Sequence, residues 1–208
     1  MMSSQLLFAL IAFAFVSSVT PGPNNLMLMT SGINFGFTRT IPHMLGVGIG
    51  FTLMIVLVGA GIIQILDAIP GAQMAIRTAS ILYLLYMAWT IATAKPAVKE
   101  ITETDVRSAR PFTFTQAALF QWVNPKAWTM ALTAVSAYTP KAQPAIGLLV
   151  VALVFGAINL PCVSAWAVMG VKLRGLLSDP GKLRIFNVTA ALILVATLYP
   201  IVFGSGRA

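Results

Sequence analysis

Long stretches without a charged side chain constrain this chain more than any other feature of its sequence. Only 9% of its 208 residues are charged, whereas an ordinary soluble domain has about 25%. A helix that crosses a bilayer needs about 20 predominantly apolar residues. The charge-free runs are 1–38, 40–66, 78–94, 142–171 and 185–206, and a sixth run, 111–140, contains one charge, Lys126. We therefore expect an all-α integral membrane protein.

The runs predict six transmembrane helices joined by short loops. The expected spans cover 5–36, 40–66, 71–94, 111–139, 143–171 and 184–203. The longest stretch between spans, 95–110, is too short to bury a core of its own. The whole chain, 1–208, is therefore expected to be a single membrane domain, with halves 1–94 and 111–208 joined by the linker 95–110.

The distribution of Lys and Arg predicts how the spans are oriented. Nine basic residues fall on the side that carries the loops after spans one, three and five: Arg39, Lys95, Lys99, Arg107, Arg110, Lys172, Arg174, Lys182 and Arg184. Three fall on the other side: Arg77, Lys141 and Arg207. Basic loops stay in the cytoplasm, so we expect a multi-pass protein of the cytoplasmic (inner) membrane with both termini outside. The net charge of +8 is then a topology signal, and no nucleic-acid partner is expected.

Helix breakers recur near the middle of the first and fourth spans. The first span contains Pro-Gly-Pro-Asn at 21–24, and the fourth contains Asn-Pro-Lys at 124–126. Proline removes a backbone donor and clashes with the preceding turn, so both spans are expected to split into half-helices. Three spans in each half place the second half upside down relative to the first. The pattern predicts a 3+3 inverted repeat with broken helices one and four, and ordinary proline kinks are the alternative interpretation.

The two breaks indicate a small-molecule site near the bilayer midplane. Broken backbone persists in hydrocarbon only where it lines a cavity or is buried in protein. Gly22 or Asn24 is expected to cap the second half of span one, and Asn124 that of span four. Unpaired N–H groups at both helix starts would suit a carboxylate. Carbonyls freed by the breaks, or Asn159, would accept from an ammonium group.

Lys126 lies at the centre of the fourth span. A charge there costs about 3 kcal/mol on insertion scales, so its side chain is expected to face a cavity rather than lipid. We expect it to anchor a carboxylate and to carry a proton. The alternative is that it snorkels or pairs with a carbonyl at the break. The full set of residues expected to bind substrate is Pro21, Gly22, Pro23, Asn24, Asn124, Pro125, Lys126 and Asn159.

Titratable residues are rare in the spans, and this limits both the cargo and the groups that could couple transport to protons. No Asp or Glu lies deep in a span, so a cationic cargo would have no counter-charge and a neutral amino acid is favoured. The titratable candidates for proton coupling are Asp67, His43 and Lys126. His43 has no neighbouring ligand set and Cys162 is the lone cysteine, so neither a metal nor a cofactor is expected. An enzyme is disfavoured because acid and base residues are not clustered.

The spacing of several motifs resembles the lysine-exporter (LysE) family. The residues are the Pro-Gly-Pro-Asn motif at 21–24, followed by Gly32, Gly36, Gly46 and Gly50, then Tyr83-Leu84 and Asn-Pro-Lys-Ala at 124–127. The resemblance implies a six-span carrier that exports amino acids in exchange for protons. Within the family, the chain is most similar to the branch that exports neutral amino acids, including cysteine and O-acetylserine.

Taken together, these observations predict a single membrane transport domain, a secondary transporter that exports small neutral amino acids or their derivatives. A passive channel and an exporter of another small solute remain the alternatives. The expected partners are an amino acid and membrane lipid. A homo-oligomer also stays open, because the paired glycines do not define an oligomeric state.

Overall fold

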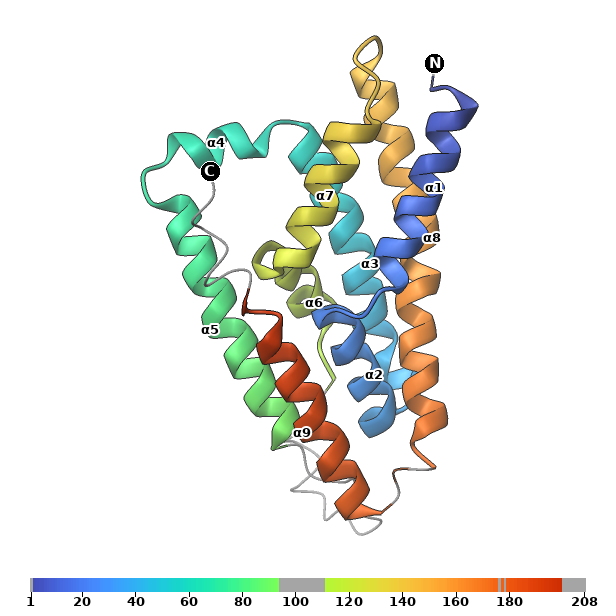
Figure 1. Ribbon diagram of the computed structural model, residues 1–208, viewed down its shortest axis with the longest axis vertical. Coiled ribbons are helices and arrows are strands. Elements are labelled where there is room, and N and C mark those ends of the chain that lie inside the picture. Colours follow the sequence, from blue (N-terminus) through green and yellow to red (C-terminus); the bar gives the residue numbers. More distant parts are fainter. Residues whose placement is uncertain (1, 94–110, 176, 178, 200–208) are drawn as a thin grey trace.

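The regular structure of the chain is helical throughout the described residues. The computed structural model describes residues 2–93, 111–175, 177 and 179–199, and no strand occurs among them. In chain order the elements are α1 (Ser4–Val19), α2 (Pro23–Phe35), α3 (Phe37–Gly59), α4 (Ile62–Ala68), α5 (Ala72–Ala92), α6 (Phe114–Phe120), the short 3-10 helix η2 (Gln121–Val123), α7 (Pro125–Tyr138), α8 (Pro144–Leu173) and α9 (Pro180–Ala196). The prediction of an all-α fold is confirmed (Figure 1). The linker 95–110 and the C-terminal residue lie outside the described residues.

Both predicted helix breaks are present. In the first span, α1 ends at Val19 and α2 begins at Pro23, with a bend of 52° between them. In the fourth, η2 ends at Val123 and α7 begins at Pro125. Each proline is the first residue of its helix, where its fixed φ suits the helix and its missing N–H leaves no bond unmade. Proline therefore ends one half-helix and begins the next.

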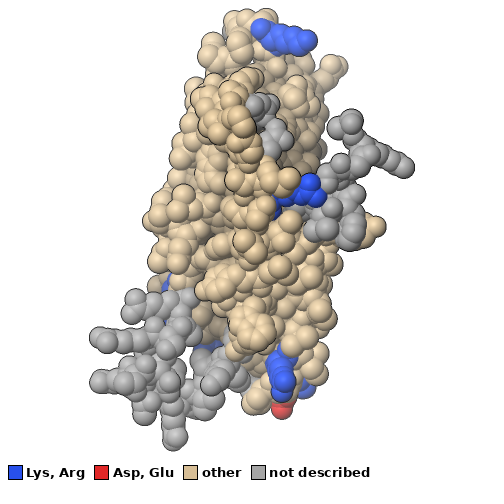
Figure 2. Space-filling view, turned by 90° about the vertical axis from the view of Figure 1, so that its left-hand side faces the viewer, with Lys and Arg blue, Asp and Glu red and all other residues tan. Residues whose placement is uncertain are grey.

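The described helices that could cross a bilayer number three or four. By length and hydropathy α3, α8 and the part of α5 from Met74 to Ala92 each qualify, and α1 with α2 adds a fourth as a bent pair. The predicted end of span two at residue 66 is wrong, because α3 stops at Gly59. Gly61 adopts φ +101°, a left-handed conformation that suits glycine, and the chain turns there into α4. Figure 2 shows a broad surface on which charged side chains are few.

Two long helices hold the half-helices in place. α3 and α8 pack along each other, α1 and α2 pack along α8, and α6 and α7 pack along α3. Phe51 of α3 meets Phe155 of α8 edge to face, with ring centroids 5.6 Å apart in the buried core. α5 and α9 pack together on one side of this group (Figure 1). The break of the first span thus lies against α8, and that of the fourth span lies against α3.

Glycines allow these helices to touch through their backbones. A Cβ atom added to Gly32 of α2 would lie 2.2 Å from the carbonyl oxygen of Ala167 in α8. One added to Gly46 of α3 would lie 2.4 Å from the carbonyl oxygen of Phe114 in α6. Real side chains cannot approach backbone so closely, so both positions require glycine. Close approach through small residues is the usual way that membrane helices associate.

We predict that Gly32→Ala destabilises the protein by separating α2 from α8. The added methyl group overpacks a backbone contact, which lowers the free energy of unfolding by about 1–3 kcal/mol. Gly175→Ala is the matched control, because a Cβ atom there meets nothing within 4 Å. Thermal unfolding of the purified proteins in detergent measures the difference. Equal melting temperatures for the two variants would contradict the close contact.

Candidate functional site

The two breaks meet at a small polar cavity at mid-height in the molecule. Its volume is about 20 Å³, which is room for roughly one water molecule. The lining combines both breaks with residues of α1, α3 and α8: Ser17, Ser18, Gly22, Asn24, Asn25, Phe51, Gln121, Asn124, Lys126, Ala127, Met130, Asn159 and Val163. An amino acid is larger than this space, and we call this conformation, into which none fits, the closed one.

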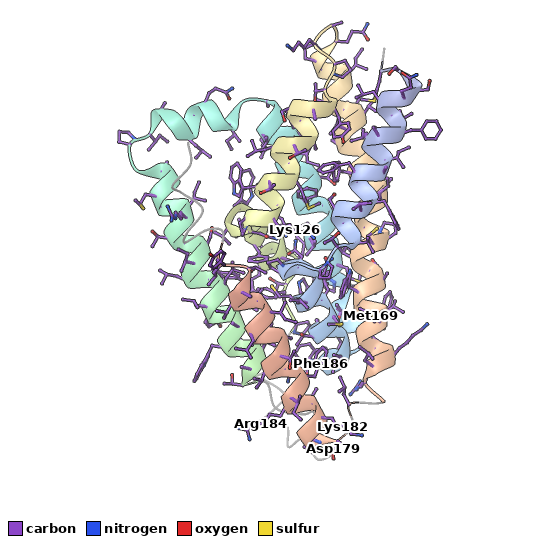
Figure 3. The ribbon with its side chains drawn as sticks, in the orientation of Figure 1. Lys126, Met169, Asp179, Lys182, Arg184 and Phe186 are labelled. Atoms are coloured by element: carbon purple, nitrogen blue, oxygen red, sulfur yellow. The ribbon has the colours of Figure 1, made fainter. Side chains whose placement is uncertain are left out.

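Lys126 extends from the start of α7 across the break of the first span. Figure 3 shows it at mid-height, far from the charged residues Asp179, Lys182 and Arg184 at the lower end. Its Nζ donates a hydrogen bond to the carbonyl oxygen of Thr20, the C-cap of α1. A Cβ atom on Gly22 would lie 2.6 Å from the Lys126 Cδ, so the lysine stem fits there because residue 22 is glycine. Lys126 thus lines the cavity, as expected from the sequence, and it pairs with a carbonyl at the break, which was the alternative interpretation.

A second cross-link joins the breaks through side-chain amides. Asn24 Nδ2 donates to Gln121 Oε1 at 2.8 Å, and Gln121 Nε2 donates back to Asn24 Oδ1 at 3.3 Å. Gln121 Nε2 also donates to the carbonyl oxygen of Ala117, one turn earlier in α6. This last bond fixes the Gln121 amide. The amide pair therefore ties the start of α2 to the end of the α6–η2 segment.

The carbonyls that the first break releases are already engaged by protein donors. Asn25 Nδ2 lies 2.9 Å from the carbonyl oxygens of both Ser18 and Thr20. Trp166 Nε1 of α8 donates to the carbonyl oxygen of Val19 at 3.2 Å. Buried carbonyls need such partners because an unpaired one is costly in an apolar setting. They are therefore weaker candidates for binding an ammonium group than the sequence suggested.

Asn159 is the remaining acceptor at the cavity. Its Nδ2 donates to the Ser18 hydroxyl at 3.1 Å, which orients the amide. The side chain is 5% exposed, and its Oδ1 has no hydrogen-bond partner within the described part of the chain. A buried amide oxygen without a partner is unusual. An incoming ammonium group would satisfy it.

The two half-helix starts differ in how they are capped. Gly22, rather than Asn24, is the N-cap of α2, and no side chain caps that end. Asn124 is the N-cap of α7, and its side chain accepts from the Lys126 N–H at 3.1 Å. Asn124 thus caps this half-helix as expected from the sequence, and its side chain occupies the first N–H of α7. The α2 end is the more open and retains the partial positive charge of a helix start.

The other predicted residues divide into those that shape the breaks and those that lie elsewhere. Pro23 and Pro125 begin helices but are absent from the cavity lining, and Pro21 is exposed in the turn. His43 is buried in α3 against Phe112, with ring centroids 5.1 Å apart, and it does not line the cavity. Asp67 lies in α4, and its side chain falls outside the part that the structure describes.

Sequence reasoning missed four polar residues at the cavity, namely Ser17, Ser18, Asn25 and Gln121. Gln121 precedes Asn124 by three residues, one helical turn, which was an available signal. Asn25 directly follows the Pro-Gly-Pro-Asn motif. Ser18 gave no signal, because its role depends on the approach of Asn159 from a helix 141 residues away in the sequence.

Comparison with known proteins identifies a family and several relatives of the chain. Residues 15–198 match the LysE type translocator family. Cysteine/O-acetylserine efflux proteins of Escherichia coli (strain K12), Escherichia coli O139:H28 (strain E24377A / ETEC) and Shigella flexneri are 31%, 30% and 31% identical to it over 199 residues. Each alignment covers 93% of this chain and 96% of the relative.

No solved structure matches the chain. The resemblance that the glycine-proline motif suggested is confirmed, and the relatives are transporters rather than enzymes. Together with its apolar helices, this makes the chain a multi-pass membrane protein that belongs to the LysE type translocator family.

Proposed function

We propose that the protein is a secondary transporter that exports small neutral amino acids or their derivatives by proton exchange. One observation carries the proposal: Lys126, a cation, and Asn159, whose buried Oδ1 has no partner among the described residues, line the same cavity. An amino acid presents the complementary pair, a carboxylate and an ammonium group. Family membership and the cysteine/O-acetylserine efflux proteins among the relatives support the class of cargo.

In this proposal the cargo carboxylate binds Lys126 and the uncapped start of α2. A carboxylate is a stronger partner for an ammonium group than a neutral carbonyl, because both members of the pair are charged. The cargo would therefore take Lys126 from the Thr20 carbonyl. The cargo ammonium would donate to Asn159 Oδ1. Side chains must move to admit it, since the closed cavity holds about 20 Å³.

A neutral cargo is favoured by the lack of acidic groups at the site. Within the part of the chain that the structure describes, no Asp or Glu lines the cavity. Asp179, whose side chain is described, caps the start of α9 at the lower end of the molecule (Figure 3). A second positive charge on lysine or arginine would enter a low-dielectric site without a counter-charge, which is unfavourable.

Six spans in a 3+3 inverted repeat, in the cytoplasmic membrane, form the proposed framework. The packing is consistent with it, since α1 lies along α8 as α6 lies along α3, and α5 pairs with α9. The inverted repeat would exchange the α1–α8 contact with the α6–α3 contact, and it would map the α5–α9 contact onto itself. The nine-to-three distribution of basic residues supports termini outside and the linker inside.

We assign proton coupling to a residue other than Lys126, which anchors the cargo carboxylate in this proposal. Lys126 meets an acceptor in the closed protein and would meet another when loaded, and both favour its charged form. His43 is buried, and neither of its ring nitrogens has a hydrogen-bond partner among the described residues, whereas the Asp67 side chain lies outside them. We therefore favour His43 over Asp67. Transport by the His43→Gln variant, measured with and without an imposed pH gradient, tests this choice.

The function is tested by transport in proteoliposomes with a panel of radiolabelled amino acids. We expect small neutral amino acids to be transported faster than lysine or arginine, and an imposed pH gradient to accelerate them. Excess unlabelled substrate on the opposite side should stimulate exchange, which a carrier shows and a passive channel does not. A preference for lysine, or the absence of such stimulation, would contradict the proposal.

The anchor role predicts that Lys126→Met reduces uptake of free amino acids by about 10- to 100-fold, the range for losing a hydrogen bond to a charged group. Discrimination between an amino acid and its carboxamide should disappear in the same variant. Lys141→Met is the matched control, because Lys141 is exposed in the turn between α7 and α8. Equal discrimination in Lys126→Met and the parent would remove Lys126 from the site.

A further inference from the structure

The two cross-links between the breaks join different pairs of half-helices. Lys126 Nζ and the Thr20 carbonyl connect α7 to α1, which both extend toward the N-terminal end of the molecule (Figure 1). Asn24 and Gln121 connect α2 to the α6–η2 segment, and α2 and α6 both lie toward the opposite end (Figure 1). Each cross-link therefore ties together the half-helices on one side of the cavity. We call these the N-terminal side and the opposite side.

The cross-links occupy equivalent positions in the two halves of the chain. Asn24 and Lys126 are each the second residue of a half-helix that begins with proline. Each reaches the end of the first half-helix of the other span, at Gln121 and at Thr20 respectively. Exchange of the two halves would exchange the two cross-links. Their chemistry differs, however, because one is a neutral amide pair and the other contains a charge.

From this arrangement we infer that the cross-links are two separate gates of the cavity, one for each side of the membrane. The amide pair Asn24–Gln121 closes the opposite side, and the Lys126–Thr20 contact closes the N-terminal side. The inference rests on the proposed function for its cargo and assigns which gate the cargo controls. Both cross-links are formed in this structure, so both gates are shut.

The difference in chemistry makes one gate sensitive to cargo. A carboxylate competes for Lys126 but has no charged partner in the amide pair. Cargo that enters from the opposite side would therefore draw Lys126 from Thr20 and unlock the N-terminal side. With the N-terminus outside, loading from the cytoplasm releases the outer gate. This gives the direction that an exporter requires.

Cysteine labelling from each side tests the gates without any cargo. Cys162→Ser removes the lone cysteine, and Ala127→Cys places a reporter in the buried cavity lining. A membrane-impermeant methanethiosulfonate is applied to intact cells and to inside-out vesicles. Lys141→Cys and Lys172→Cys, both exposed and at opposite ends of α8, calibrate the two sides in separate samples.

Lys126→Met should raise the labelling rate of the reporter about tenfold or more from the N-terminal side alone, because the charged contact no longer closes that side. Asn24→Ala should raise it from the opposite side alone. Lys126→Gln and Gln121→Leu serve as second variants, and thermal unfolding in detergent confirms that each protein is folded. Labelling that rises on both sides in either folded variant, on the reversed side, or on neither would overturn the gates.

The outcome is separable from that of the proposed function. Side-specific labelling with no amino-acid transport would retain the gates and reject the cargo. Transport of neutral amino acids without side-specific labelling would retain the cargo and reject the gates.

Discussion

The interruption of two helices by proline is the constraint on which the rest of the structure depends. Each break releases backbone carbonyl and N–H groups inside an apolar protein, where unpaired polar groups are costly. The side chains of Asn25, Trp166 and Lys126 satisfy the carbonyls of the first break. The polar cluster at the centre of the molecule follows from this need. The proposed transport site lies where the fold already requires hydrogen-bonding groups.

The two breaks are not equivalent, and their difference determines where the site carries positive charge. Asn124 caps its own helix and occupies the first N–H of α7. Gly22 leaves the start of α2 uncapped and also makes space for the lysine stem. The Lys126 side chain therefore lies beside the start of α2. Asn159, supplied by α8, provides the acceptor of the proposed site.

Local chemistry explains which features were predictable from sequence. Proline and glycine act on their own backbone, so both breaks and the helix start at Pro125 were predicted correctly, and the start at Pro23 matches Gly22, one of the two expected caps. A lone charge in an apolar span must find a polar partner, so Lys126 was also identified. The partners themselves depend on tertiary packing. Gln121 was missed for that reason, and the early end of α3 was missed because Gly61 acts through its positive φ rather than through polarity.

The central claim is that cargo binds where the two breaks meet, and protection of a cavity cysteine tests it most directly. Ala127→Cys in the Cys162→Ser background is alkylated with and without a small neutral amino acid, and Lys141→Cys in the same background is the control. The account predicts slower alkylation at position 127 with the free amino acid, little protection by its carboxamide or its N-acetyl derivative, and none at position 141. Equal protection by all three compounds, or by none, would contradict it.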